Sequence, residues 1–287
     1  MKLLKVVLFV VLFCAVERFC HKQTGGFSLH KILPRQQAEG AGLEGKELQE
    51  VESLLDQPFH YFAKGGQCYI FASADGRVVI KFFKQHHMHF WRWLEALPLP
   101  KFFDGYRKHM IAKHQHQSSD FLFESSKLAY ERFKDRTGMV YLHLNRTDCF
   151  KKKLVIVDKL GIQHQIDPNA IDFAVQKRAE VLSHKKLKRL IKEKKFEMAK
   201  QCIDSLVDLI AERSKKGIKD LDPNFRSNFG FLGEKAIEID IGSYQNDDLI
   251  PVAYKTEVMH QTRDLKEWLN RRNAELALYL DETIEAL

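Results

Sequence analysis

The sequence has few cysteines for its length, and they lie far apart. There are five in 287 residues, and no CxxC pair occurs among them. Zinc ribbons and thiol redox motifs need cysteines paired at short spacing. The sequence therefore argues against either as the basis of the fold and predicts reduced, buried thiols at Cys14, Cys20, Cys68, Cys149 and Cys202.

An HExxH motif is also lacking, although histidine is plentiful. Six of the 13 histidines lie in the segment 85–117, a basic and aromatic stretch interrupted by Pro98 and Pro100: His86, His87, His89, His109, His114 and His116. A helical metal site would need histidines four residues apart together with a carboxylate. We therefore expect this segment to be an inserted region with solvated or stacked imidazoles, not a metal centre. The chain has no internal repeat either.

A long hydrophobic run occurs at one place only, near the N-terminus. Lys2 and Lys5 precede an apolar run from Val6 to Val16. Eleven residues suit a signal peptide better than a full membrane span, which needs about 20. Because no clean cleavage site follows, the pattern predicts an uncleaved anchor in residues 1–20 with the domain in the cytoplasm. Export after signal cleavage is the alternative.

The balance of charge is basic. Lysine and arginine number 46 against 38 acidic residues, which gives a net charge of +8. This permits contact with phosphates, acidic partners or a membrane surface without identifying one. The densest basic stretch lies between Lys177 and Lys200 and has no interleaved aromatic residues, so nucleic-acid binding is not favoured. We expect a solvated helix face there, and contact with a membrane surface is the second interpretation.

Hydrophobic residues make up 45% of the chain, which supports one large domain or two lobes with a substantial core. After a linker and short helix in residues 21–55, strands are predicted at 60–66, 67–73 and 77–83, with a turn at Asp75-Gly76. A helix at 118–137 and two strands at 139–145 and 152–160 follow. Helices are predicted at 168–195, 196–216 and 264–287, and a hairpin at 229–240 precedes the last of them.

Several chemistry-bearing residues fall at the ends of these elements. Gly65 and Gly66 lie between two strands, where backbone amides can approach phosphate oxygens closely. Lys81 lies in the apolar strand VVIKFF, where an unpaired ammonium would be costly. Glu124 and Glu131 are seven residues apart on one face of the next helix. Glu124 is nearer the middle of that helix and further from the next strand, which is where the family resemblance described below places the glutamate partner of Lys81.

The stretch GIKDLDPNFRSNFGFLGEKAIEIDIG, residues 217–242, carries the most weight. Asp222 follows a helix-ending glycine, Asn228 begins the predicted hairpin, and Asp240 ends it in Asp-Ile-Gly. Oxygen ligands such as these suit a hard cation such as Mg²⁺. Asp220 with Asn224 is an alternative pair, although Asn224 would lie far from Asp240 for a simple hairpin.

In this order the motifs resemble those of the protein-kinase-like superfamily, over about residues 59–242. The resemblance implies an α+β, two-lobed fold, with a five-stranded antiparallel N-lobe sheet plus helix and a reduced, mainly helical C-lobe. It implies ATP as cofactor, with Gly65, Gly66, Lys81 and Glu124 at the nucleotide. It also implies Mg²⁺ at Asn228 and Asp240, and Asp222 as the residue that accepts the proton of the attacking hydroxyl. The lobes would cover residues 56–160 and 161–287, with the connection between them near Val157-Asp158-Lys159-Leu160.

The sequence departs from the family pattern at four points. The spacing GxGxxG is not kept, the usual His-Arg before the catalytic aspartate is Asp220-Leu221, the loop to Asn228 is one residue longer, and no APE motif follows. We therefore expect a compact kinase-like phosphotransferase that transfers the γ-phosphate to the hydroxyl of an unidentified protein or small molecule. An inactive pseudokinase or a membrane-associated interaction module is the alternative.

Overall fold

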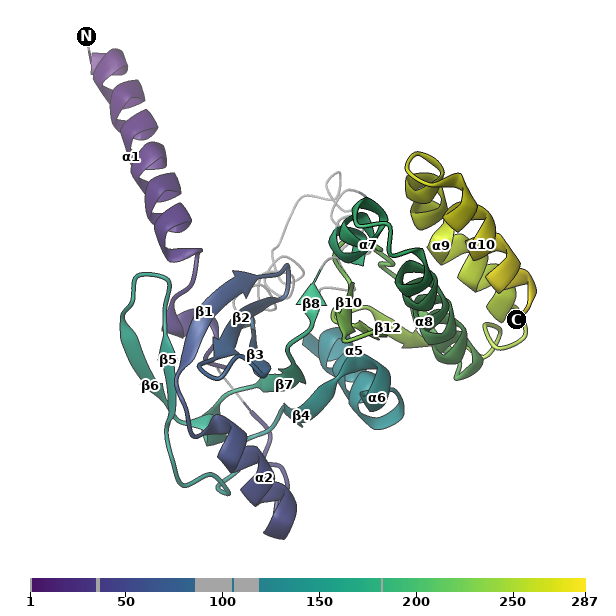
Figure 1. Cartoon of the computed structure of the whole chain (residues 1–287). Coiled ribbons are helices and arrows are strands. Elements are labelled where there is room, and N and C mark those ends of the chain that lie inside the picture. The colour runs from purple at the N-terminus through teal and green to yellow at the C-terminus, as the bar shows by residue number, and fades with distance from the viewer. Residues whose placement is uncertain (1, 35–36, 86–104, 106–118, 182) are drawn as a thin grey trace. The chain divides into compact units, whose positions relative to one another are not determined.

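The computed structural model describes residues 2–34, 37–85, 105, 119–181 and 183–287 (Figure 1). The chain divides into two compact units, and each is described by itself. Unit 1 consists of Met1–His114 and His143–Gln176, and unit 2 of Gln115–Leu142 and Lys177–Leu287. The predicted segment 85–117 lies outside the described residues apart from residues 85 and 105. The fold is α+β, as predicted.

The largest sheet has seven strands in the order β4-β7-β3-β2-β1-β5-β6. Their bounds are β1 Phe59–Lys64, β2 Cys68–Ser73, β3 Val78–Phe83, β4 Met139–His143, β5 Leu154–Val157, β6 Gln163–Ile166 and β7 Phe173–Lys177. The pairs β1–β2, β2–β3 and β5–β6 are antiparallel, but β1–β5 is parallel. The prediction of five antiparallel strands was therefore wrong, because the sheet is both larger and mixed.

The meander β1–β2–β3 forms where it was predicted. Gly76 takes the left-handed conformation (φ 71°) that its turn requires, and the Asp75 carboxylate accepts hydrogen bonds from the Arg77 amide and the Ser73 hydroxyl. Inward-facing phenylalanines from neighbouring strands pack edge to face in the core of unit 1, with 5.6 Å between the ring centres of Phe71 and Phe82. This packing accounts for the apolar positions of the three strands.

Part of the second half departs from the prediction. Residues 168–195 were expected to be helical, but they form the short 3₁₀ helix η4 (Pro168–Ala170), β7, β8 (Glu180–Val181) and only then α7 (Ser183–Lys192). Phe173, Ala174 and Val175 are all buried, as in a strand covered on both faces. A run that is apolar on successive residues carries no helical period, so tertiary burial decides its conformation.

The connection between lobes was expected after β5. Instead, Asp158 closes a tight turn: its carboxylate accepts the amides of Leu160 and Ile162, and Gly161 has φ 83°. The chain returns as β6 and pairs with β5. This polar strand was not predicted, because three of its four residues are not buried and it lies at the sheet edge.

Unit 2 is mainly helical. Its helices are α5 Ser119–Arg132, α6 Lys134–Thr137, α7, α8 Phe196–Lys215, α9 Tyr254–Asn270 and α10 Ala274–Glu285. Helix α8 buries Cys202, Leu206 and Leu209 in the core, as its predicted apolar face requires. The single helix predicted at 264–287 is in fact two, because Asn273 is extended and accepts the Leu276 amide as the N-cap of α10.

The predicted membrane anchor, and the localisation based on it, is wrong. Helix α1 runs from Lys2 to Thr24, but across the described residues no helix is both long and apolar enough to cross a membrane. The physical reason is that the apolar run of α1 ends at Val16 and the helix continues through Glu17, Arg18 and Lys22. The transmembrane assignment is therefore withdrawn.

Candidate functional site

Two short antiparallel strand pairs position the predicted site within unit 2. Strand β9 (Ile218–Asp220) pairs with β12 (Tyr244–Asn246), and β10 (Phe229–Leu232) pairs with β11 (Lys235–Glu238) around Gly233. The hairpin predicted at 229–240 is thus confirmed. The loop 221–228 leaves the first pair and enters the second, and the segment 239–243 makes the return connection. The two connections are therefore anchored at both ends by paired strands.

The start of this arrangement depends on the end of α8. Gly217 follows the helix with φ 70°, and its carbonyl accepts the Asp247 amide at 2.9 Å. This turn sends the chain into β9, which places Asp220 opposite Tyr244. The glycine is a left-handed helix end of the kind that the sequence predicted.

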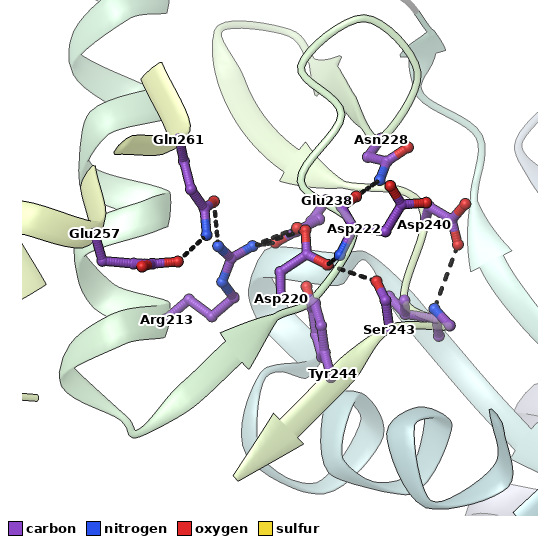
Figure 2. A network of polar contacts seen from close by, with 12 residues as sticks. Arg213, Asp220, Asp222, Asn228, Glu238, Asp240, Ser243, Tyr244, Glu257 and Gln261 are labelled. Carbon is purple, nitrogen blue, oxygen red and sulfur yellow. Dashed lines mark hydrogen bonds and ion pairs between the residues drawn. The ribbon is translucent and has the colours of Figure 1, made fainter. Parts of the chain in front are cut away.

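Asp222, Asn228 and Asp240 come together, as Figure 2 shows. The Asn228 side-chain amide donates to the Asp222 carbonyl at 2.7 Å, and the Asn228 carbonyl accepts the Ile239 amide at 2.6 Å. The extra residue of the loop is accommodated by a turn, in which the Asn224 carbonyl accepts the Asn228 amide at 2.9 Å. Asn228 is buried, whereas Asp222 and Asp240 are exposed at the open side of the loop.

The two exposed aspartates have different supports. The Asp240 carboxylate accepts the Gly242 amide at 3.3 Å, which orders the Asp-Ile-Gly turn. Partial burial, together with the negative charges of Asp220 and Asp240, raises the pKa of Asp222. A raised pKa makes this carboxylate a better proton acceptor than an isolated aspartate.

Asp220, the alternative to Asp222, has a different position. Its side chain is fully buried and forms an ion pair with Arg213 at 3.7 Å. It also accepts hydrogen bonds from the Ser243 hydroxyl at 2.5 Å and from the Asp222 amide at 3.0 Å. Asp220 therefore holds the loop 221–228 and the segment 239–243 together from the buried side. Asp222 is the accessible aspartate of the two.

Arg213 is the centre of this buried network. Its guanidinium donates to the carboxylate of Glu238 and to the side-chain oxygen of Gln261, and the Gln261 amide donates in turn to Glu257 (Figure 2). One cation thus faces two buried carboxyl groups, Asp220 and Glu238. Burial raises the pKa of Glu238 to about 8 in spite of the attraction of Arg213, and the Asp220 charge adds to the rise.

Helix α5 supports the Asp-Ile-Gly turn from another side. The buried Ser125 hydroxyl donates to the Ile241 carbonyl and accepts the Tyr244 amide at 2.7 Å. The adjacent Glu124, the predicted partner of Lys81, points to solvent: its side chain is 71% exposed and pairs with Lys127 of the same helix at 2.9 Å. The helix is thus part of the site through Ser125, which the sequence analysis did not identify.

The other predicted nucleotide residues belong to unit 1. Gly65 and Gly66 form the exposed β1–β2 turn, and Lys81 lies on β3 with intermediate burial. The neighbouring Lys84 is buried, donates to the carbonyls of Gly65 and Gly66 at 2.5 and 3.0 Å, and has a pKa lowered by burial. Lys84, which a sequence reading takes for a surface lysine, therefore orders the glycine turn.

Sequence reasoning missed the supports Arg213, Glu238 and Ser125. One signal was present for Arg213, because it continues the apolar stripe of Leu206, Leu209 and Ile210 on α8 at helical spacing. A charge in such a stripe needs a buried partner. In the part of the chain that the structure describes, no group of three or more histidine, cysteine or acidic side chains is arranged to hold a metal ion.

Comparisons with known proteins add no relative from which a role could be transferred. No protein-family model matches the chain, and no curated protein matches it. The function is therefore inferred from the residues of the site itself.

Proposed function

We propose that the protein is a kinase-like phosphotransferase that binds Mg²⁺ and ATP and transfers the γ-phosphate to a hydroxyl group. The observation that carries the proposal is the convergence of Asp222, Asn228 and Asp240, from two connections held by paired strands. These three residues are the ones that the family resemblance assigns to proton acceptance and metal binding.

Two side-chain oxygens support the proposal of a magnesium ion. Asp240 offers an exposed carboxylate, and the amide oxygen of the buried Asn228 accepts the Ser227 hydroxyl at 2.8 Å and keeps a second lone pair. Two protein oxygens suit a cation that keeps phosphate and water ligands. Burial, followed by the charges of Asp220 and Asp240, raises the pKa of Asp222, and a divalent cation would offset the repulsion between the exposed carboxylates of Asp222 and Asp240. Bound Mg²⁺ would neutralise charge on the transferring phosphoryl group.

The residues of the chain then have separate tasks. Asn228 and Asp240 would hold the metal, and Asp222 would orient the acceptor hydroxyl and take its proton. Arg213, Asp220 and Ser125 keep the two connections in register, so that positioning supplies much of the rate. Lys81 with Glu124, and the turn at Gly65 and Gly66, remain predicted contributors to nucleotide binding.

A binding-only function is the second candidate. The observation that favours it is the state of Glu124, which is exposed and paired within its own helix. A protein that keeps the metal ligands without this glutamate at the nucleotide would bind nucleotide without transferring phosphate. This alternative is a pseudokinase.

A thermal shift measurement tests nucleotide binding. Mg²⁺-ATP at ten times its Kd would add about 1.4 kcal/mol to the free energy of unfolding and raise the Tm by a few degrees. We expect this shift for the wild type, and its loss in Asp240→Ala. Asp208→Ala is the matched control, because Asp208 is an exposed aspartate of α8 away from the site. No shift in the wild type would refute the proposal.

A second variant separates the enzyme from the pseudokinase. Asp222→Ala should keep the Mg²⁺-ATP thermal shift and lose ADP production in the presence of an acceptor. If wild type and Asp222→Ala give the same low rate of ADP production with a broad panel of hydroxyl acceptors while both bind ATP, the binding-only function is the correct one.

A further inference from the structure

A cavity in unit 2 is lined almost entirely by positive side chains. It has a volume of about 650 Å³ and is lined by Lys188, Arg226, Trp268, Arg271 and Arg272. This volume is within the range of small-molecule sites. The lining combines one helix residue of α7, one residue of the loop 221–228 and three residues at the end of α9, so segments distant in sequence converge on it.

The four cations of this cavity are not in ion pairs in the part of the chain that the structure describes. Of the other α7 cations, Lys186 lies 3.5 Å from Glu234 and Arg189 lies 3.1 Å from Glu180, whereas Lys185 and Lys192 are in no ion pair among the described residues. What distinguishes Lys188 is that it lines the cavity together with three arginines.

The local structure holds part of this lining in place. The Arg272 guanidinium lies over the Trp268 ring, 4.4 Å from its centre, and donates to the Trp268 carbonyl at 3.2 Å. Trp268 itself is buried. The end of a helix attracts cations in general, which would account for Arg271 and Arg272 alone. It does not account for Lys188, within α7, or for Arg226, in a loop.

The cavity is tied to the candidate site through its loop. Arg226 follows Asp222 by four residues, so their Cα atoms lie within about 14 Å of each other even if the chain between them is extended. The loop is closed, because Asn228 donates to the Asp222 carbonyl, and the Arg226 amide donates to the side chain of Asn224 at 3.0 Å. Arg226 of the cavity and Asp222 of the candidate site therefore belong to one hydrogen-bonded loop.

We propose that this cavity is the acceptor subsite and that the acceptor is a small hydroxyl compound that already carries a phosphate group. This inference rests on the proposed function. One arginine guanidinium can donate two parallel hydrogen bonds to the oxygens of a phosphate group, and several converging cations suit a multiply charged anion. A pocket of this volume holds a small molecule, whereas an extended acidic peptide would need a longer groove.

The reaction balances without a further reactant. The acceptor oxygen forms a bond to the γ-phosphorus of ATP, and the bond from that phosphorus to the bridging oxygen breaks. The electron pair of that bond leaves with ADP. The hydroxyl proton passes to the Asp222 carboxylate, while the phosphate already on the acceptor stays in the cavity and is unchanged.

The anion site is tested first, by calorimetric titration of the full chain with pyrophosphate in the absence of Mg²⁺ and ATP. We expect binding that weakens with rising salt. Arg226→Ala/Arg271→Ala should weaken it by at least about 10-fold, because each removes a charge-assisted contact. The matched control is Lys185→Ala/Lys192→Ala, which removes two exposed cations of α7 outside the cavity and should change binding less than about 2-fold.

Two results of this titration would overturn the proposal. One is equal binding by the wild type and by Arg226→Ala/Arg271→Ala, with both proteins giving the same far-ultraviolet circular dichroism. The other is competition for the cavity by hexaglutamate at a lower concentration than pyrophosphate, which would assign it to an acidic peptide.

The acceptor role is tested by comparing matched compounds. Glycerol 3-phosphate should stimulate ADP production from Mg²⁺-ATP more than glycerol does, and Arg226→Ala/Arg271→Ala should remove the difference while the Mg²⁺-ATP thermal shift remains. Failure of the proposed function would give a different set of results: pyrophosphate would still bind the cavity, but ATP would give no thermal shift. Equal stimulation by both compounds would refute the acceptor proposal alone.

Discussion

Arg213 and Glu238 meet with both side chains fully buried, although 25 residues separate them in the chain. Asp220 shares the same guanidinium, so the pair belongs to a triad whose third member braces the loop of Asp222. A buried charge is costly unless it is paired and hydrogen-bonded. The integrity of the candidate site therefore depends on residues that do not reach solvent.

Arg213→Ala should strongly destabilise unit 2. Removing the guanidinium leaves Asp220 buried without its counterion, and such a loss costs about 3 to 5 kcal/mol. The free energy of unfolding from urea titration followed by circular dichroism measures it. Arg136→Ala is the matched control, since its ion pair with Glu212 is partly exposed and should cost no more than about 1 kcal/mol. Equal losses would contradict the role assigned to the triad.

Glu238 should make stability depend on pH. Its pKa is raised to about 8 in the folded chain, above the ordinary value of 4.5. The folded state therefore binds this proton more tightly than the unfolded state. The resulting contribution of Glu238 to the free energy of unfolding is complete below pH 4.5 and is lost as pH rises toward 8.

The comparison with Glu238→Gln measures this contribution. Between pH 5 and pH 8 the wild type should lose at least about 1 kcal/mol of unfolding free energy relative to the variant. Glu131→Gln, which changes an exposed glutamate of α5, should track the wild type at every pH. Parallel pH profiles for the wild type and Glu238→Gln would contradict a raised pKa of Glu238.

Neighbouring serines of α5 allow a sharp comparison. Ser125→Ala removes the contacts to Ile241 and Tyr244, and should lower the free energy of unfolding by about 1 to 3 kcal/mol. Ser126→Ala removes only a bond to Leu122 within the helix, so a smaller loss is expected. The Mg²⁺-ATP thermal shift should fall in Ser125→Ala alone. A greater loss in Ser126→Ala would show that α5 does not hold the Asp240 turn.

The glycine turn offers a test that separates folding from binding. Neither Gly65 nor Gly66 has a positive φ, and an added Cβ meets nothing closer than 4.0 Å. Gly65→Ala/Gly66→Ala should therefore change the free energy of unfolding by less than about 1 kcal/mol, whereas Gly217→Ala, at φ 70°, should cost about 1 kcal/mol or more.

The same double variant should reduce the Mg²⁺-ATP thermal shift if the turn approaches phosphates. Circular dichroism and urea unfolding verify that it is folded. A full shift in a folded Gly65→Ala/Gly66→Ala protein would remove the turn from the nucleotide site.

The sequence by itself determined the elements whose signals are local. The Asp75-Gly76 turn, the apolar face of α8, the glycine after it and the hairpin around Gly233 are each specified by residues a few positions apart. The approach of Asn228 and Asp240 follows from the hairpin, because its ends must meet. Asp222 joins them through the pairing of β9 with β12 and the hydrogen bond from Asn228, which the hairpin alone does not specify.

Tertiary structure alone decided the features that depend on partners distant in the chain. Phe173–Lys177 is a strand because it is buried in a sheet, β6 exists because β5 pairs with it, and Arg213 is a core residue because Glu238 and Asp220 face it. The cavity at Arg226 likewise depends on α7 and α9 meeting at one loop. Local periodicity records which residues share a face, but it does not record what covers that face, and burial against a distant partner outweighs local propensity.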